Sequence, residues 1–156
     1  MPILNYTTEI APERTIGEIT SMLVRKGARS IQTEFRADGS IEAVVFVMLV
    51  GGLPVRFALP NNAAGVLRVM LKEKPYNPSY HGYGNKEKYE AKFAAQAERV
   101  SWRILKDWIE AQLALIESGQ AEIGQVFMPY AMASDGRTMY ELFVENNQKQ
   151  LSAGGQ

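Results

Sequence analysis

The stretch "IQTEFRADGSIEAVVFVMLVGGLPVRFAL", from Ile31 to Leu59, decides the fold. Ile31, Thr33 and Phe35 face one way and Gln32, Glu34 and Arg36 face the other, which predicts a strand with the first set on the core and the second in water. Residues 41–50 become apolar on both faces from Ala43 onward. That pattern is typical of a central strand buried on both sides.

Two short turns and a third strand complete the pattern. The dipeptides Asp38-Gly39 and Gly51-Gly52 tolerate the positive φ angles that tight hairpins require. The third strand carries Pro54, which lacks a backbone donor and therefore suits a sheet edge. Its expected inward residues are Leu53, Val55, Phe57 and Leu59. The sequence predicts a three-stranded antiparallel meander, and residues 4–10 are a candidate fourth strand.

Helices are expected both before and after the meander in the sequence. Thr15 and Glu18 have the spacing of a capping box and predict a helix over residues 15–26, which Gly27 ends. Later helices are predicted over 62–72 (capped by Asn61 or Asn62, with Val66, Val69 and Met70 inward), 86–118, 121–127 and 138–145. The fold class is α+β, in the order helix, three strands, helix, long helix and two short helices. We expect one domain over residues 1–146 and a flexible polar tail over 147–156.

The composition limits the class of protein. The 156 residues include 17 Lys and Arg against 17 Asp and Glu, and 46% of them are apolar, as in ordinary globular chains. No apolar run is long enough to cross a membrane, and residues 1–10 lack the pattern of a signal peptide. Cysteine is absent, which excludes disulfides and thiolate metal sites. These features favour a cytoplasmic location.

No pattern points to an enzyme. The phosphate-binding, dinucleotide-binding, nucleophile-elbow and zinc-protease motifs are missing, so no cofactor and no catalytic residue are expected. His81 is the only histidine and has no acid nearby in sequence. Glu34 and Glu42 lie on neighbouring predicted strands and could hold a divalent cation, but a solvated sheet face explains them more simply. We therefore expect no metal site.

The segment between residues 72 and 93 carries the clearest binding signal. It interleaves four tyrosines with five lysines between two predicted helices, in the basic middle of the chain. Single-stranded nucleic acid is held by cations along its phosphates and by aromatic faces under its bases. The alternative is structural, since tyrosines also pin long loops onto helices. The candidate nucleic-acid-binding residues are Lys72, Lys74, Tyr76, Tyr80, His81, Tyr83, Lys86, Lys88, Tyr89, Lys92, Arg99 and Arg103.

The long helix extends this basic surface. Lys92, Gln96, Arg99, Arg103 and Lys106 recur at steps of three and four, as on one face of a helix. They could continue a phosphate-binding track, or they could be an ordinary solvated face. The same helix carries two apolar stripes, more than three strands can cover. A homodimer through the long helix is therefore a further expectation.

Several stretches resemble known sequences: "NYTTEIAPERTIGEI", "QAERVSWRILKDWIEAQLALIESGQAEI", "VFMPY" and "GRTMYELF". Together they are similar to short uncharacterised proteins of bacteriophages and bacterial mobile elements, and the likeness covers most of the chain. This resemblance implies a bacterial or phage cytoplasm. The order of one helix, a meander and another helix is also loosely similar in topology to the cores of single-strand annealing proteins.

Two functions from different classes follow. The first is a small accessory protein that binds nucleic acid, with single strands favoured, through the Tyr/Lys segment and the basic helix face. The second is a protein-binding module, for example an inhibitor of a host defence system, without nucleic-acid contact. The neutral net charge and the excess of acidic over basic side chains in residues 104–156 favour the second function.

Overall fold

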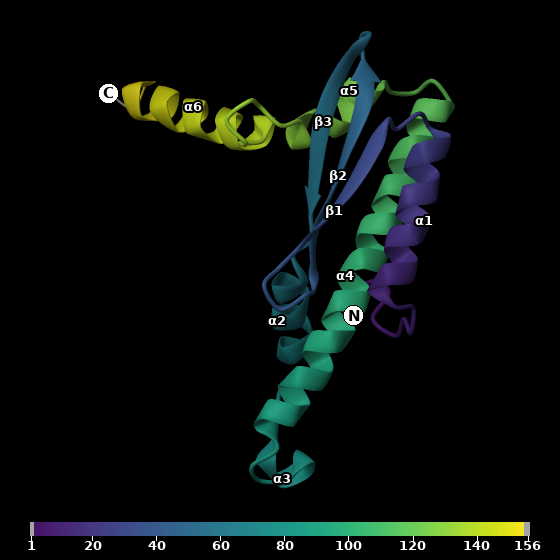
Figure 1. Cartoon of the computed structure of the whole chain (residues 1–156). Helices are drawn as coiled ribbons and strands as arrows, with labels where there is room; N and C mark the ends of the chain where they lie inside the picture. The colour runs from purple at the N-terminus through teal and green to yellow at the C-terminus, as the bar shows by residue number, and fades with distance from the viewer. Residues whose placement is uncertain (1, 155–156) are drawn as a thin grey trace. The chain divides into compact units, whose positions relative to one another are not determined.

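The structure is a computed structural model that describes the backbone of residues 2–154 and the side chains of residues 2–148. It contains one antiparallel sheet and several helices (Figure 1), which confirms the predicted α+β class and element order. The elements are α1 Pro12–Arg25, β1 Ser30–Phe35, β2 Ile41–Val50, β3 Leu53–Pro60, α2 Ala63–Glu73, α3 Pro78–His81, α4 Lys86–Glu117, α5 Ile123–Phe127, the 3-10 helix η1 Met128–Tyr130 and α6 Met139–Gly154.

The chain divides into two compact units, which are described separately. Unit 1 comprises Met1–Ser21 and Asn61–Glu110, and unit 2 comprises Met22–Pro60 and Ala111–Gln156. Both α1 and α4 contribute residues to each unit. Each unit combines two segments of chain that are distant in sequence. Whether the two units form the predicted single domain over residues 1–146 stays a prediction.

The sheet of unit 2 has the strand order β1-β2-β3. β2 occupies the predicted residues and is central, with four consecutive buried side chains from Ala43 to Phe46. Val44 lies opposite Thr33 on one side and Leu59 on the other. Gly51 and Gly52 have φ angles of +57° and +84°, as a two-residue hairpin turn requires. The predicted meander is confirmed.

Two of the expected inward residues of the sheet are exposed instead. Phe35 is exposed because the register between β1 and β2 shifts between Glu34 and Phe35. Such a bulge interrupts the alternation of side chains between the two faces of the sheet. Leu53 is exposed because it directly follows the Gly51-Gly52 turn at the end of the hairpin. Deeper in β3, Phe57 and Leu59 are fully buried as predicted.

Residues 4–10 do not form the candidate fourth strand. Asn5 has a φ angle of +63°, and the chain turns there, with the amide of Thr8 donating to the carbonyl of Asn5 at 3.0 Å. The side-chain amide of Gln96 then donates to the carbonyls of Tyr6 and Thr8, at 2.9 and 2.8 Å. The backbone of this segment is satisfied by its own turn and by α4 rather than by a sheet edge.

α1 begins earlier than the capping-box pattern predicts. Pro12 is its first residue, a position where the missing N–H is no loss and the fixed φ suits a helix. Thr15 is therefore an interior, fully buried residue and not the N-cap. At the other end, the amides of Ala28 and Gly27 donate to the carbonyls of Leu23 and Val24, at 3.0 and 3.1 Å. This is a Schellman motif, so Gly27 ends the helix as predicted.

α2 is capped as expected. The Asn62 side chain accepts a hydrogen bond from the amide of Gly65 at 3.0 Å, and the helix ends shortly before Pro75. Met70 is buried, but Val69 is exposed and not inward as predicted. The buried residues of α2 are Ala63 and Met70, two turns apart, and Val69 lies about 100° away from that line.

α4 covers almost all of the predicted residues 86–118 and is followed by Gly119. Within residues 2–154, no helix combines the length and the apolar character needed to cross a membrane.

The C-terminal helix α6 is longer than the predicted helix over residues 138–145. The Thr138 hydroxyl accepts from the amide of Glu141 at 3.2 Å, as an N-cap should. The helix then continues to Gly154, since neither proline nor glycine interrupts residues 139–153. Residues 155–156 lie outside the described part of the chain, and the predicted flexibility of residues 147–156 stays a prediction.

Candidate nucleic-acid interface

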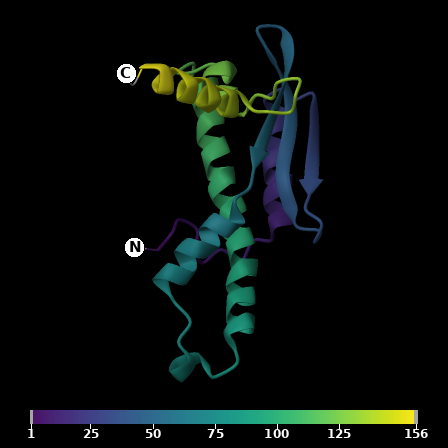
Figure 2. The same ribbon diagram turned by 90° about the vertical axis from the view of Figure 1, so that its left-hand side faces the viewer.

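The segment between α2 and α4 folds around a cluster of rings. The imidazole of His81 lies 4.5 Å from the Tyr89 ring and 5.8 Å from the Tyr76 ring, measured between centroids. Tyr89 in turn lies 4.7 Å from Phe93 of α4. The short helix α3 is part of this arrangement and lies beyond the N-terminal end of α4 within unit 1 (Figures 1 and 2). We call residues 72–92 the tip.

Local hydrogen bonds explain the backbone of the tip. Asn77 caps α3, since its side chain accepts from the amide of Ser79 at 3.0 Å, and Pro78 takes the first helical position. The Asn85 side-chain amide donates to the carbonyl of His81 at 3.0 Å. Asparagine, proline and glycine thus act here as turn formers.

Tyr76 and Tyr89 have structural roles. The Tyr76 hydroxyl donates to the carbonyl of Gly82 and accepts from the amide of Asn85, while the Tyr89 hydroxyl donates to the carbonyl of Lys74 at 2.6 Å. Both rings are half-buried among other rings. For these two candidate residues, the observed contacts fit the structural alternative, because each ring already packs against two or more other rings.

His81 is half-buried at the centre of the cluster. Its Nδ1 lies 3.0 Å from the amide nitrogen of Asn77. The same Nδ1 lies 3.1 Å from the carbonyl oxygen of Asn77, so the ring contacts the backbone of Asn77 in either tautomer. The aromatic rings of Tyr76, Tyr80 and Tyr89 surround the imidazole. His81 therefore supports the fold of the tip.

Tyr80 and Tyr83 differ from the other two tyrosines. Their exposed fractions are 86% and 84%, and they lie at the end of α3 and in the turn that follows it. Tyr80 and His81 form a T-shaped pair, with ring centroids 5.4 Å apart. Two aromatic rings are thus presented to solvent on a segment whose backbone is hydrogen-bonded in place.

Lysines of the tip accompany these rings. Lys72, Lys74, Lys88 and Lys92 are exposed, and no carboxylate among residues 2–148 lies within ion-pair distance of them. The Lys86 ammonium lies 4.0 Å from the Glu90 carboxylate, one helical turn away. Such an exposed pair is weak and does not prevent Lys86 from meeting a phosphate.

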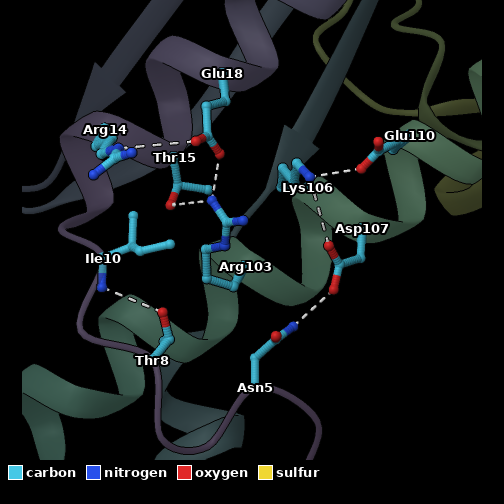
Figure 3. A network of polar contacts seen from close by, with 10 residues as sticks. All are labelled: Asn5, Thr8, Ile10, Arg14, Thr15, Glu18, Arg103, Lys106, Asp107 and Glu110. Carbon is cyan, nitrogen blue, oxygen red and sulfur yellow. Dashed lines mark hydrogen bonds and ion pairs between the residues drawn. The ribbon is translucent and has the colours of Figure 1, made fainter.

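Arg103 is not part of an exposed basic face. Its Nη1 donates to the Glu18 carboxylate and lies 3.4 Å from the Thr15 hydroxyl of α1 (Figure 3). Only 14% of its side chain is exposed. The spacing pattern could not reveal this, since Glu18 lies 85 positions away in the sequence. This ion pair and the low exposure disfavour Arg103 as a contact residue, and its place in the candidate interface stays a prediction.

The remaining helix residues are also engaged. Arg99 donates through Nε to the Gln96 side-chain oxygen at 2.9 Å, and Gln96 itself holds the N-terminal segment. The Lys106 ammonium lies 2.6 Å from Glu110, while Asp107 accepts from the Asn5 side chain at 2.8 Å (Figure 3). The predicted phosphate track along α4 therefore shortens to its N-terminal part, near Lys88 and Lys92.

Two cavities were not evident from the sequence. A pocket of about 220 Å³ in unit 1 borders the tip and is lined by Pro2, Tyr6, Thr7, Met70, Glu73, Lys74 and Phe93. A groove of about 480 Å³ in unit 2 is lined by Gln125, Met128, Pro129, Met139, Tyr140 and Phe143. Each combines separate segments of the chain, so no local spacing pattern marks it.

Glu34 and Glu42, the two carboxylates considered for a divalent cation, lie on the neighbouring strands β1 and β2. Glu34 lies opposite Ala43 in the ladder, so Glu34 and Glu42 are not paired across the hairpin. Among the described residues, no group of three or more His, Asp or Glu side chains is arranged to hold a metal ion.

The chain matches no protein-family model, no curated protein and no solved structure. The resemblance to phage and mobile-element proteins and the looser likeness to single-strand annealing cores therefore stay predictions.

Proposed function

We propose that this chain is a small accessory protein that binds single-stranded nucleic acid through its tip. The observation that carries the proposal is the exposure of Tyr80 and Tyr83 next to exposed lysines. Unstacked bases present flat faces that exposed rings can cover, whereas a duplex hides those faces. The proposed contact residues are Lys72, Lys74, Tyr80, Tyr83, Lys86, Lys88 and Lys92.

The chemistry of the tip predicts modest affinity and a shallow salt dependence. Residues 72–92 contain five lysines and three glutamates, which gives the tip a net charge of +2. If all five lysines met phosphates, log K would fall against log salt with a slope of about −3.5. Stacking on Tyr80 and Tyr83 would contribute about 1–3 kcal/mol per base.

A binding titration tests the proposal. Fluorescence anisotropy of a labelled oligothymidine at about 20 mM salt should show binding that weakens as salt is added. Tyr80→Ser combined with Tyr83→Ser should weaken it by at least about tenfold, because two stacking platforms are lost. The matched control is Tyr140→Ser, since Tyr140 is also exposed but lies in unit 2. Absence of binding by the wild-type protein, or equal binding by the double variant, would refute the proposal.

The second candidate function is that of a protein-binding module. It is favoured by the groove in unit 2, where Tyr140 and Phe143 are each 61% exposed. Exposed apolar side chains gathered around one concavity are typical of protein contact sites. Both candidate functions make the chain a binding protein rather than an enzyme, and both suit the bacterial or phage cytoplasm that the resemblance implies.

A further inference from the structure

The groove of unit 2 is apolar and open. η1 contributes Met128 and Pro129, and the first turns of α6 contribute Met139, Tyr140 and Phe143. Methionine adapts its shape to a partner, and aromatic side chains are common anchors in interfaces. In unit 2, the exposed side chains of Met128, Met139, Tyr140 and Phe143 border this hollow of about 480 Å³.

The chain around the groove is acidic. Residues 118–148 contain four carboxylates, from Glu122, Asp135, Glu141 and Glu145, and one cation, Arg137. Arg137 is already bound, since it contacts Asp135 at 2.7 Å and also pairs with Glu145. Glu141 is exposed in the first turn of α6, directly after Tyr140. The segment has a net charge of −3, so a fitting partner would bring apolar or aromatic groups beside cations.

We infer that the occupant of this groove is the tip of a second copy of the chain. The tip offers two exposed rings, Tyr80 and Tyr83, among exposed lysines, which is the combination of aromatic groups and cations that the groove favours. Its net charge of +2 complements the −3 of the groove segment. The rings lie among Met128, Met139 and Phe143 of the other copy, and Lys86 or Lys88 faces Glu141.

Other occupants fit less well. A groove packed on the same groove of a second copy would bring two acidic segments together, which is unfavourable. An anionic lipid surface would be repelled for the same reason. The inference does not depend on nucleic-acid binding. Because both events use Tyr80 and Tyr83, however, an oligonucleotide and a second copy of the chain would compete for the tip.

The geometry of this contact defines its stoichiometry. The tip and the groove are different surfaces, so the contact is heterologous and leaves one free tip and one free groove on each pair. Association should therefore continue beyond a dimer, into a ring or an open chain. Since a few side chains on each side make the contact, it should bury less than a standard interface. We expect a dissociation constant of about 10 µM at low salt, rising with salt.

Complementation between two variants tests the inference. Phe143→Ser removes an exposed anchor of the groove, and Tyr80→Ser with Tyr83→Ser removes the anchors of the tip. Sedimentation equilibrium of the wild type at low salt should give an average mass that rises with concentration past that of a dimer. Each variant alone should stay monomeric. An equimolar mixture should form dimers and stop there, because one intact tip meets one intact groove.

A control and two further results complete the test. Leu53→Ser also removes an exposed apolar side chain of unit 2, outside the groove, and should associate like the wild type. If the tip variant alone associates like the wild type, the tip is not the occupant and the inference is wrong. A wild-type protein that stays monomeric up to about 1 mM, some hundred times the expected dissociation constant, would also overturn it.

Discussion

Arg103 and Glu18 connect α4 to α1 inside unit 1, and their ion pair defines the first prediction. Truncating Arg103 leaves the Glu18 carboxylate, which is 35% exposed, without its main partner. Because partial exposure lets water replace part of the interaction, we expect Arg103→Gln to lower the free energy of unfolding by about 1–2 kcal/mol. Urea denaturation measures this. The exposed variant Lys92→Gln should change stability by less than about 0.5 kcal/mol, and an equal effect of both variants would contradict the assignment.

Asp38 provides the second prediction at this scale. In the β1–β2 turn, the Ser40 hydroxyl and amide donate to Asp38 at 2.6 and 2.9 Å. These two hydrogen bonds hold the pKa of the Asp38 carboxyl below its usual value. A lowered pKa means that the turn is stabilised above the unfolded-state pKa and loses this contribution as the pH falls through the folded-state pKa.

An NMR titration of the Asp38 carboxyl carbon checks this. The midpoint should lie below 3.8 in the wild type and move upward in Ser40→Ala, since that variant loses the hydroxyl donor. Asp135 is the internal control. The neighbouring Arg137 side chain holds the Asp135 pKa down, so its midpoint should be the same in both proteins. An unshifted Asp38 midpoint in Ser40→Ala would show that the hydroxyl bond does not matter.

At the scale of elements, replacement of glycine by alanine should have opposite effects at two positions, one inside α1 and one just after its end. Gly17 is an exposed interior residue of α1, and nothing lies within 4 Å of an added Cβ. Gly27 ends the same helix with a φ angle of +100°. Gly17→Ala should stabilise the protein by about 0.5–1 kcal/mol, because alanine loses less backbone entropy on folding. Gly27→Ala should destabilise it by about 1–2 kcal/mol, because a Cβ disfavours positive φ.

Thermal or urea unfolding of the two variants beside the wild type measures both effects. Changes of the same sign would mean that the end of α1 is placed wrongly.

The sequence predicts elements well where one strong local signal dominates. β2 matches its predicted bounds because a ten-residue apolar run between two turn dipeptides permits few other structures. The start of α1 was missed because two valid start signals compete, and Pro12 precedes the capping-box residues Thr15 and Glu18. Phe35 was placed wrongly because a bulge depends on pairing with another strand. Such tertiary effects leave no local pattern.

At the scale of the whole molecule, the candidate site could be predicted only in part. The sequence shows that the tip is rich in tyrosine and lysine, but it does not show which tyrosines are packed and which are exposed. Tyr76 and Tyr89 pack among rings while Tyr80 and Tyr83 face water, and this depends on how α3 folds against α4. The ion pair of Arg103 joins residues 85 positions apart, and the groove of unit 2 depends on how residues 125–129 lie against residues 139–143. Only a folded chain shows which charges are already satisfied.

The last prediction concerns how the two units unfold. α1 and α4 each supply residues to both units, and a helix that loses the packing of one half becomes marginal as a whole. We therefore expect the units to unfold together in a single transition, as one domain over residues 1–146 would. Tryptophan fluorescence follows unit 1, because Trp102 and Trp108 both lie in its part of α4.

Amide hydrogen exchange of Val44 and Phe46, in the buried strand β2, follows unit 2. Both measurements should give the same free energy of unfolding and the same dependence on urea. Gly27→Ala sharpens the comparison, because its substitution lies in unit 2 and should still lower the fluorescence midpoint of unit 1. A fluorescence midpoint that does not respond, beside faster exchange in β2, would show two independently stable units, and the one-domain prediction would then be wrong.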